Sequence, residues 1–327
     1  MNRSEHDALV GETLAGRYRV ERMLGQGGMG AVYAARQIDL GRRVAVKVLL
    51  EELSEDGKQL ERFRREAMAA ASLGHPNVVQ VTDLHAEPGS HAFLVMELVE
   101  GASLHEILED RKRLAPEVIV PIVRQVLAAL GAAHAAGMVH RDVKPANIMV
   151  LELEGGGCVA KLLDFGIAKM LEGEAATKLT STGITLGTPM YMSPEQASGD
   201  PVDLRTDLYA VGVVTYKALA GRPPILSSDI GDLLIRLATS GAPSLGEANA
   251  ELDPALVAVI DRALRQSPDA RYQSAAEMSA ALAPWGASSR GGAGLGGESL
   301  DIHEAPTVPM PEAGGTLETD PATVPSR

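Results

Sequence analysis

The segment that decides the fold is Met138–Val150, MVHRDVKPANIMV. It encloses a histidine, an arginine, an aspartate, a lysine and an asparagine between two apolar flanks. Apolar flanks of this kind head for a protein core, where charged groups are costly unless they are paired or put to use. Pro145 disfavours helical geometry at Lys144, so a loop is expected here. The segment therefore indicates a polar loop at the edge of the interior.

The five polar residues follow the pattern H-R-D-x-K-x-x-N from His140 to Asn147. Such a loop can aim the carboxylate of Asp142 at a substrate hydroxyl and the amide oxygen of Asn147 at a metal ion, while Lys144 reaches a transferring phosphate. Any one of these residues is explained more simply as part of a satisfied polar turn. Five fixed identities at about 1/20 each, however, arise only about once in 10⁴ random chains of this length, and this favours chemistry.

Two further motifs follow in the same part of the chain. The first is DFG at Asp164–Gly166, and the second is GTPMYMSPE at Gly187–Glu195. Together with the polar loop they occur in the order of a known catalytic signature set.

A glycine-rich stretch, LGQGGMGAVY, lies near the N-terminus at Leu24–Tyr33. Its Gly25, Gly27 and Gly30 fit G-x-G-x-x-G, which alone is a weak signal and is equally typical of a glycine-rich hairpin. A dinucleotide-binding fingerprint needs a helix after the glycines, whereas AVYAAR has the composition of a strand. A strand–glycine–strand hairpin can instead lie over a nucleotide with its backbone N–H groups near the phosphates.

Lys47 stands in the apolar strand VAVK. Its charge needs a partner there, unless the side chain snorkels at the strand end. Glu66 in FRREAMAAA, on or near the apolar face of the next helix, is the predicted partner. A Lys47–Glu66 ion pair would hold the ammonium group where it meets the α and β phosphates of a nucleotide.

The pattern along the chain predicts an α+β fold with a strand-rich lobe followed by a mostly helical lobe. Short β-branched runs bounded by turn residues predict strands at 18–24, 31–36, 42–50 and 92–99. Helical composition and apolar periodicity predict helices at 59–72, 116–137, 253–266 and 274–285. The segment 207–221 is apolar nearly all round, which predicts a helix in the core. No internal repeat is present.

The expected domain boundaries follow from these elements. Residues 1–16 form an N-terminal extension and residues 17–285 form the main domain, with a strand-rich lobe at 17–97, a hinge at 97–101 and a helical lobe at 101–285. Residues 286–327 are rich in Gly, Pro, Ser and Thr. Such a segment cannot bury enough apolar surface to offset its chain entropy, so we predict a disordered tail.

Composition limits the possible function classes. The formal net charge of −13 argues against a general nucleic-acid-binding surface. The single cysteine, Cys158, excludes an intrachain disulfide and favours a reducing compartment; we expect a buried structural thiol. No signal-peptide pattern is evident, and the apolar run at Ala210–Ala220 is too short to span a bilayer. These features predict a soluble cytoplasmic protein without a membrane span.

As a set, these motifs resemble those of the eukaryotic-like Ser/Thr protein kinases of bacteria. The resemblance covers about Tyr18–Pro284, the full length of a kinase domain. It implies a bilobal protein-kinase fold and the ATP-dependent phosphorylation of Ser and Thr hydroxyls on proteins. It also implies ATP and Mg²⁺ (Mn²⁺ being possible) as cofactors, and proteins as substrates.

The resemblance implies roles for individual residues. Asp142 accepts or orients the substrate hydroxyl proton, Lys144 steadies the γ-phosphate, and Thr188 with Lys144 marks Ser/Thr specificity. Asn147 and Asp164 hold the metal ion, and Lys47 pairs with Glu66. Met96 is the gatekeeper of the adenine site, and Glu97 and Val99 belong to the hinge. The implied ATP site comprises Leu24, Gly25, Gln26, Gly27, Gly28, Met29, Gly30, Ala31, Val32, Ala45, Lys47, Met96, Glu97, Val99 and Met149.

The resemblance also implies a structural frame around the site. Glu195 pairs with Arg271, and Asp207 bonds the backbone of the His140–Arg141 turn. Ala70 stands where the family usually has Leu or Met, which predicts a loosely docked helix.

Regulation is expected at the loop KLTSTGITLGT and in the tail. Arg141 needs an anion beside it, so autophosphorylation at Thr180 or Thr182 would order the loop. In the tail, Thr307 in APTVP and Thr323 in ATVP are candidate sites for phosphothreonine-reading modules, although such tails usually serve as linkers. A homodimer through the strand-rich lobe is a further possibility. A small-molecule phosphotransferase and a non-catalytic nucleotide sensor remain alternative functions.

Overall fold

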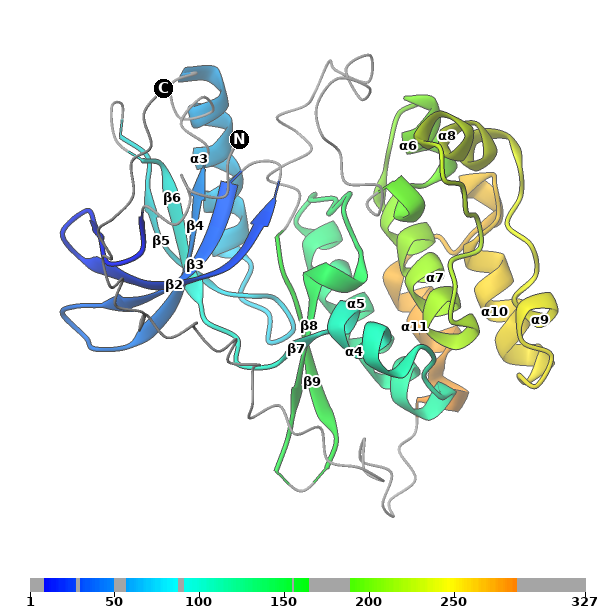
Figure 1. Ribbon diagram of the computed structural model, residues 1–327. Helices are drawn as coiled ribbons and strands as arrows, with labels where there is room; N and C mark the ends of the chain where they lie inside the picture. Colours follow the sequence, from blue (N-terminus) through cyan, green and yellow to red (C-terminus); the bar gives the residue numbers. More distant parts are fainter. Residues whose placement is uncertain are drawn as a thin grey trace, which may run out of the picture.

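In the computed structural model the chain forms two lobes, one built on a sheet and one built of helices (Figure 1). The structure describes residues 9–27, 30–49, 57–87, 91–154, 156–164 and 189–286. The predicted α+β architecture is confirmed. Among the expected features, Gly28, Met29, Thr180, Thr182, Thr188 and the tail with Thr307 and Thr323 lie outside the described residues.

The strand-rich lobe contains a six-stranded antiparallel sheet with the strand order β1-β2-β3-β4-β6-β5. Its strands are β1 (Thr13–Leu14), β2 (Tyr18–Gly27), β3 (Gly30–Gln37), β4 (Arg43–Leu49), β5 (Val81–His85) and β6 (Phe93–Glu97). Four of them match the predicted strands. β5 was not predicted, because its sequence VTDLH lacks a strict alternation of apolar and polar residues.

The two faces of this sheet serve different purposes, because successive side chains along a strand point to opposite sides. On one face, Tyr33, Val46 and Phe93 belong to the core of the lobe. On the other face, Leu49 and Leu94 pack against helix α3. Ala45 and Lys47 alternate with Val46 along β4, so they share the face that carries α3.

Helix α3 (Gly57–Ser72) forms near the predicted range. Leu60, Phe63 and Ala67 recur on its apolar face and are buried against the sheet. Ala70 is buried as well, at 6% exposure. The loose docking expected from the small side chain of Ala70 stays a prediction.

The strand-rich lobe reaches further toward the N-terminus than the sequence indicates. Thr13 and Leu14, placed in the N-terminal extension by sequence, pair with Arg19 and Tyr18. Leu14 is buried in the core of this lobe, which the short sequence signal of a two-residue strand could not reveal.

The helical lobe is organised around two central helices, α5 (Pro116–Ala135) and α7 (Leu204–Ala220). The other helices are α4 (Leu104–Arg111), α6 (Pro194–Ser198), α8 (Ile230–Thr239), α9 (Leu245–Ala248), α10 (Pro254–Ala263) and α11 (Ala275–Ala281). Short 3₁₀ turns lie at Pro145–Asn147, Pro189–Tyr191, Pro268–Ala270 and Ala283–Trp285. Helix α7 is buried nearly all round, as its apolar sequence predicts.

Helix α5 is also long and apolar enough, with a mean hydropathy of 1.6, to be compared with a membrane span. It is longer than the apolar run at Ala210–Ala220 that the sequence analysis compared with a membrane span. Half of its apolar window is buried, and it packs against β9, α7 and α11. This packing is that of a central core helix.

A small second sheet stands between the two lobes. It is formed by β7 (Ala102–Ser103), β8 (Ile148–Glu152) and β9 (Cys158–Leu162), in that order. In Figure 1 these strands lie between the large sheet and the helices. β8 follows the polar loop directly and β9 leads to Asp164, so this sheet fixes where the polar loop ends and where the DFG motif begins.

Candidate active site

The polar loop places Asp142, Lys144 and Asn147 in mutual contact. The Asp142 carboxylate lies 2.8 Å from Lys144 Nζ. Asn147 Nδ2 donates to the Asp142 carbonyl at 2.8 Å and to its Oδ2 at 3.1 Å. The side chains of Asp142 and Lys144 keep 17% and 23% exposure, so the charges are paired yet reachable from solvent. This answers why charged residues stand at the edge of the interior.

The backbone of the loop is held by Asp207, which lies in the first turn of α7 and is fully buried. Its two oxygens accept the N–H groups of His140 at 2.8 Å and Arg141 at 2.7 Å. This bond was predicted and is confirmed. The same carboxylate also lies 2.8 Å from His134 Nε2, a contact that the sequence analysis did not identify.

Lys47 meets the site from the strand-rich lobe. Its Nζ lies 2.9 Å from Oδ2 of Asp164, and the lysine side chain is only 11% exposed. The burial explains why the ammonium group needs a carboxylate, as its place in an apolar strand predicts. The partner in this structure is Asp164. The Lys47–Glu66 pair stays a prediction, because the described part of the structure does not include the Glu66 side chain.

An apolar cluster lies beside Lys47 where the two lobes meet. Ala45, Val79 and Met96 are buried in it, and Val32 and Val99 pack against them. Such a surface suits a flat, largely apolar ring with a few polar edges. Four of the predicted adenine-site residues therefore lie together.

The other described members of the predicted ATP site are placed as follows. Leu24, Gly25 and Gln26 are exposed on β2, and Met149 is half-buried on β8, opposite Ser103. Ala31 belongs instead to the core on the opposite face of the sheet, so only its backbone is available to a nucleotide.

Gly30 allows β3 to lie close to β4. Its φ of +155° is a conformation that residues with side chains rarely adopt, and an added Cβ would lie 1.9 Å from the Val48 carbonyl oxygen. The close approach of β3 to β4 therefore requires glycine at this position.

Asn147 and Asp164 are the candidate donors for a metal ion. Among the residues that the structure describes, no group of three or more His, Cys, Asp and Glu side chains gathers as a candidate metal centre. Asn147 bonds to Asp142 through Nδ2, so its amide oxygen is suited to a cation, and Asp164 carries carboxylate oxygens, one of which is paired with Lys47. Two residues with hard oxygen donors cannot fill the coordination shell of a divalent ion. They fit an ion that keeps water molecules and phosphate oxygens as its other ligands.

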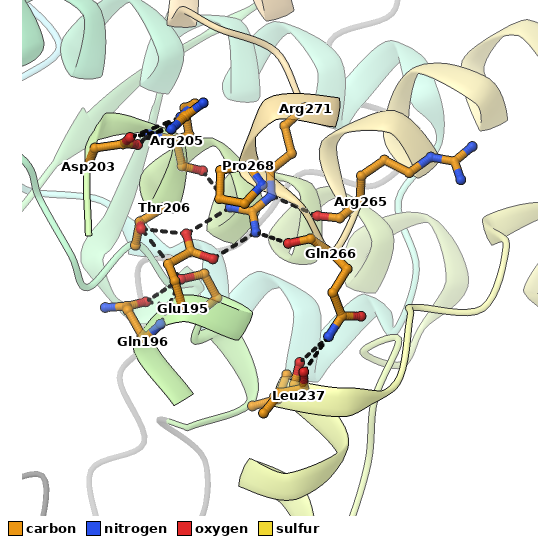
Figure 2. A network of polar contacts seen from close by, with 12 residues as sticks. Glu195, Gln196, Asp203, Arg205, Thr206, Leu237, Arg265, Gln266, Pro268 and Arg271 are labelled. Carbon is orange, nitrogen blue, oxygen red and sulfur yellow. Dashed lines mark hydrogen bonds and ion pairs between the residues drawn. The ribbon is translucent and has the colours of Figure 1, made fainter. Parts of the chain in front are cut away.

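Helix α6, which follows the GTPMYMS stretch, is anchored by a buried ion pair. Arg271 Nη1 and Nη2 donate to Oε1 and Oε2 of Glu195 at 2.8 and 2.7 Å, as predicted (Figure 2). Burial alone would raise the pKa of Glu195, but hydrogen bonds from Arg271 and Thr206 outweigh it and lower the pKa. The pair fixes α6, which starts immediately before Glu195 at Pro194.

Sequence reasoning missed an ion pair between the hinge and β9. Lys161 Nζ lies 2.7 and 2.8 Å from the two carboxylate oxygens of Glu97, and Glu97 Oε1 also accepts the Gln80 N–H at 2.9 Å. The available signal was the lysine in the apolar strand CVAKL, which resembles Lys47 in its strand. The pair links the end of β6 to the strand that leads to Asp164.

Comparisons with known proteins agree with this geometry. The family described as "Protein kinase domain" matches residues 18–282. The serine/threonine-protein kinase pkn3 of Myxococcus xanthus is 42% identical over 285 residues, which cover 86% of this chain and 52% of the relative. PknB of Mycolicibacterium smegmatis is 40% identical over 272 residues, which cover 82% and 43%. The chain thus spans about half or less of the length of these relatives.

A solved structure gives the same result for the fold. The kinase domain of PknI from Mycobacterium tuberculosis superposes with a TM-score of 0.65 at 32% identity, covering 84% of this chain and 98% of that domain. A double mutant of the same domain gives a TM-score of 0.67 at 30% identity.

Proposed function

The chain belongs to the protein kinase family, in its bacterial serine/threonine branch, and we propose that it transfers the γ-phosphoryl group of ATP to serine and threonine hydroxyls of proteins. One observation carries this proposal. The Leu163 N–H, next to Asp164, donates to the Asn147 carbonyl at 2.8 Å, so the Lys47–Asp164 pair lies beside the Asp142–Lys144–Asn147 cluster. Together they supply a candidate base, two cations and two oxygen donors.

The chemistry follows from these groups. Asp142 orients the substrate hydroxyl and accepts its proton, while the hydroxyl oxygen bonds to the γ-phosphorus and the bond to the bridging oxygen of ADP breaks. Lys144 stabilises the charge on the transferred group, and Lys47 holds the α and β phosphates. Since the transition state spreads negative charge over oxygens, positioning and neutralisation supply most of the rate enhancement.

We assign nucleotide and metal binding in the same way. The adenine ring lies against Val32, Ala45 and Met96, and the backbone at Glu97 and Val99 bonds its edge. The glycine-rich hairpin covers the phosphates. Asn147 and Asp164 hold Mg²⁺, which neutralises phosphate charge when bound. The oxygen-only donor set supports this choice, and Mn²⁺ fits the same donors.

The test is a transfer assay with the full chain. Purified protein is incubated with labelled ATP, Mg²⁺ and a generic basic protein. We expect label on serine and threonine, and its loss in both Lys47→Met and Asp142→Asn. Transfer to small molecules alone would favour a small-molecule phosphotransferase, and nucleotide binding without turnover would favour a sensor.

Autophosphorylation is a further part of the proposal. We assign it to Thr180 or Thr182, because Arg141 directly before Asp142 is a suitable partner for a phosphate. Thr188, together with Lys144, is assigned to Ser/Thr specificity. Mass spectrometry of the recombinant chain should find phosphate at Thr180 or Thr182, and none in Asp142→Asn. A fully active chain with both threonines unmodified would contradict the assignment.

A cytoplasmic location is proposed from the single cysteine and the need for ATP.

A further inference from the structure

Both backbone groups of Arg141, the residue directly before Asp142, are hydrogen-bonded to other parts of the helical lobe. The Arg141 N–H donates to Oδ1 of Asp207 at 2.7 Å, and the Arg141 carbonyl accepts from Nε2 of Gln196 at 3.0 Å. Arg141 has a φ of 63°, in the left-handed region. A non-glycine residue persists there only when its surroundings fix it. These two contacts therefore help to fix the backbone conformation that precedes Asp142.

The amide of Gln196 is oriented by its own helix. Its Oε1 accepts the backbone N–H of Ser193 at 3.1 Å, as part of the capping box that begins α6. A glutamine amide has one acceptor oxygen and one donor nitrogen, so this bond leaves Nε2 to donate. The donor finds the Arg141 carbonyl. A single side chain thus joins the start of α6 to the polar loop.

Helix α6 is a firm base for this contact. Glu195, next to Gln196, is held by Arg271 at 2.7 and 2.8 Å and by Thr206 Oγ1 at 2.7 Å. Figure 2 shows Gln196 beside Glu195 at one end of this network. Because the network is buried, it fixes the point from which Gln196 reaches Arg141.

We infer that Gln196 is a positioning residue for phosphoryl transfer. It transmits the placement of α6 to the Arg141 carbonyl and thereby holds the Asp142 carboxylate in line with the substrate hydroxyl. The inference rests on the proposed function, because it assumes that Asp142 orients that hydroxyl. It predicts that loss of the donor changes the rate of the chemical step and leaves ground-state binding intact.

Gln196→Glu is the variant that isolates the donor. Glutamate serves the capping box as well as glutamine does, so α6 keeps its cap. The second carboxylate oxygen would face the Arg141 carbonyl with no proton between them. We expect kcat to fall about 10- to 100-fold, as for a small misplacement of a catalytic group, with KM for ATP and peptide unchanged.

Gln266→Glu is the matched control. Gln266 Nε2 also donates to a backbone carbonyl of the helical lobe, that of Ala238 at 2.6 Å, and none of the side-chain contacts described for Gln266 involves the polar loop. We expect this variant to lower the melting temperature and to keep the wild-type kcat. Gln196→Glu should keep the wild-type melting temperature and lower kcat. A Gln196→Glu enzyme with wild-type kcat would overturn the inference.

The pH dependence of kcat in the variants gives a further test, because a purely structural role of Gln196 would not change it. Protonation of the introduced carboxyl restores an O–H donor toward Arg141. The ratio of kcat in Gln196→Glu to wild-type kcat should therefore rise as pH falls, whereas the ratio for Gln196→Ala should stay flat. Parallel behaviour of the two variants would overturn the assigned role of the donor.

Hydrogen exchange of the full chain without nucleotide separates this inference from the proposed function. We expect faster amide exchange in the segment 138–147 in Gln196→Glu, and wild-type exchange there in Gln266→Glu. If that difference appears but the wild type transfers no phosphate, the proposed function fails and the positioning contact stands. If the wild type transfers phosphate and Gln196→Glu matches it in kcat and exchange, the inference fails alone.

Discussion

Glu195 and Arg271, 76 residues apart in the chain, form a two-pronged ion pair in which the arginine is fully buried. Every N–H group of the guanidinium has an acceptor. Two donate to Glu195, and the others donate to the backbone carbonyls of Arg265, Gln266 and Arg205 at 2.7, 2.8 and 3.2 Å. The geometry explains why a charge is tolerated at this depth, since no donor is left unpaired.

Arg271→Lys should be strongly destabilising for this reason. A lysine has three donors on one atom, so it cannot bond both carboxylate oxygens and the three carbonyls together. We expect the free energy of unfolding to fall by about 3 kcal/mol, measured by urea denaturation. Arg236→Lys, which alters an exposed pair with Asp232, is the control and should leave it unchanged. Equal effects of the two variants would contradict the role of the buried fork.

The same pair makes stability depend on pH. The pKa of Glu195 lies below its ordinary value of 4.5 in the folded chain, so the unfolded chain binds the proton more readily. The stabilisation is thus present above pH 4.5 and is lost as pH falls from there through the folded pKa. Glu195→Gln should cost stability at neutral pH, with a difference from wild type that shrinks in acid. Urea titrations at several pH values test this, and a constant difference would contradict it.

The sequence predicted those parts of the fold and site that depend on local pattern or on motif spacing. β4 and α7 have nearly continuous apolar sequences, and the His140–Asn147 motif places its own groups within one loop. The contacts of His134 with Asp207 and of Lys161 with Glu97 were missed, because each joins residues more than 60 positions apart that carry no shared motif. The face on which Ala31 packs depends on the exact strand register, which composition does not determine.

Gly30 and Gly25 allow a test of the hairpin geometry. A methyl group at Gly30 would overlap the Val48 carbonyl, whereas a Cβ at Gly25 has no atom within 4 Å. We expect Gly30→Ala to lower the free energy of unfolding by about 1–3 kcal/mol, and Gly25→Ala to leave it unchanged or slightly higher. Thermal unfolding without nucleotide compares the two directly. Similar melting temperatures would show that β3 and β4 do not approach as closely as described.

Cys158 should be a slow nucleophile. The thiol was expected to be buried but is only partly so, because it stands at the first position of β9 beside the turn. Burial, and then the charge of Glu152, raise its pKa above the ordinary value of 9.0. Since the thiolate is the reactive form, iodoacetamide should modify the native chain about tenfold more slowly than the urea-unfolded chain at neutral pH. With one cysteine in the chain, mass spectrometry follows a single adduct. The native rate should keep rising through alkaline pH, and a plateau near neutral pH would indicate an activated thiol instead.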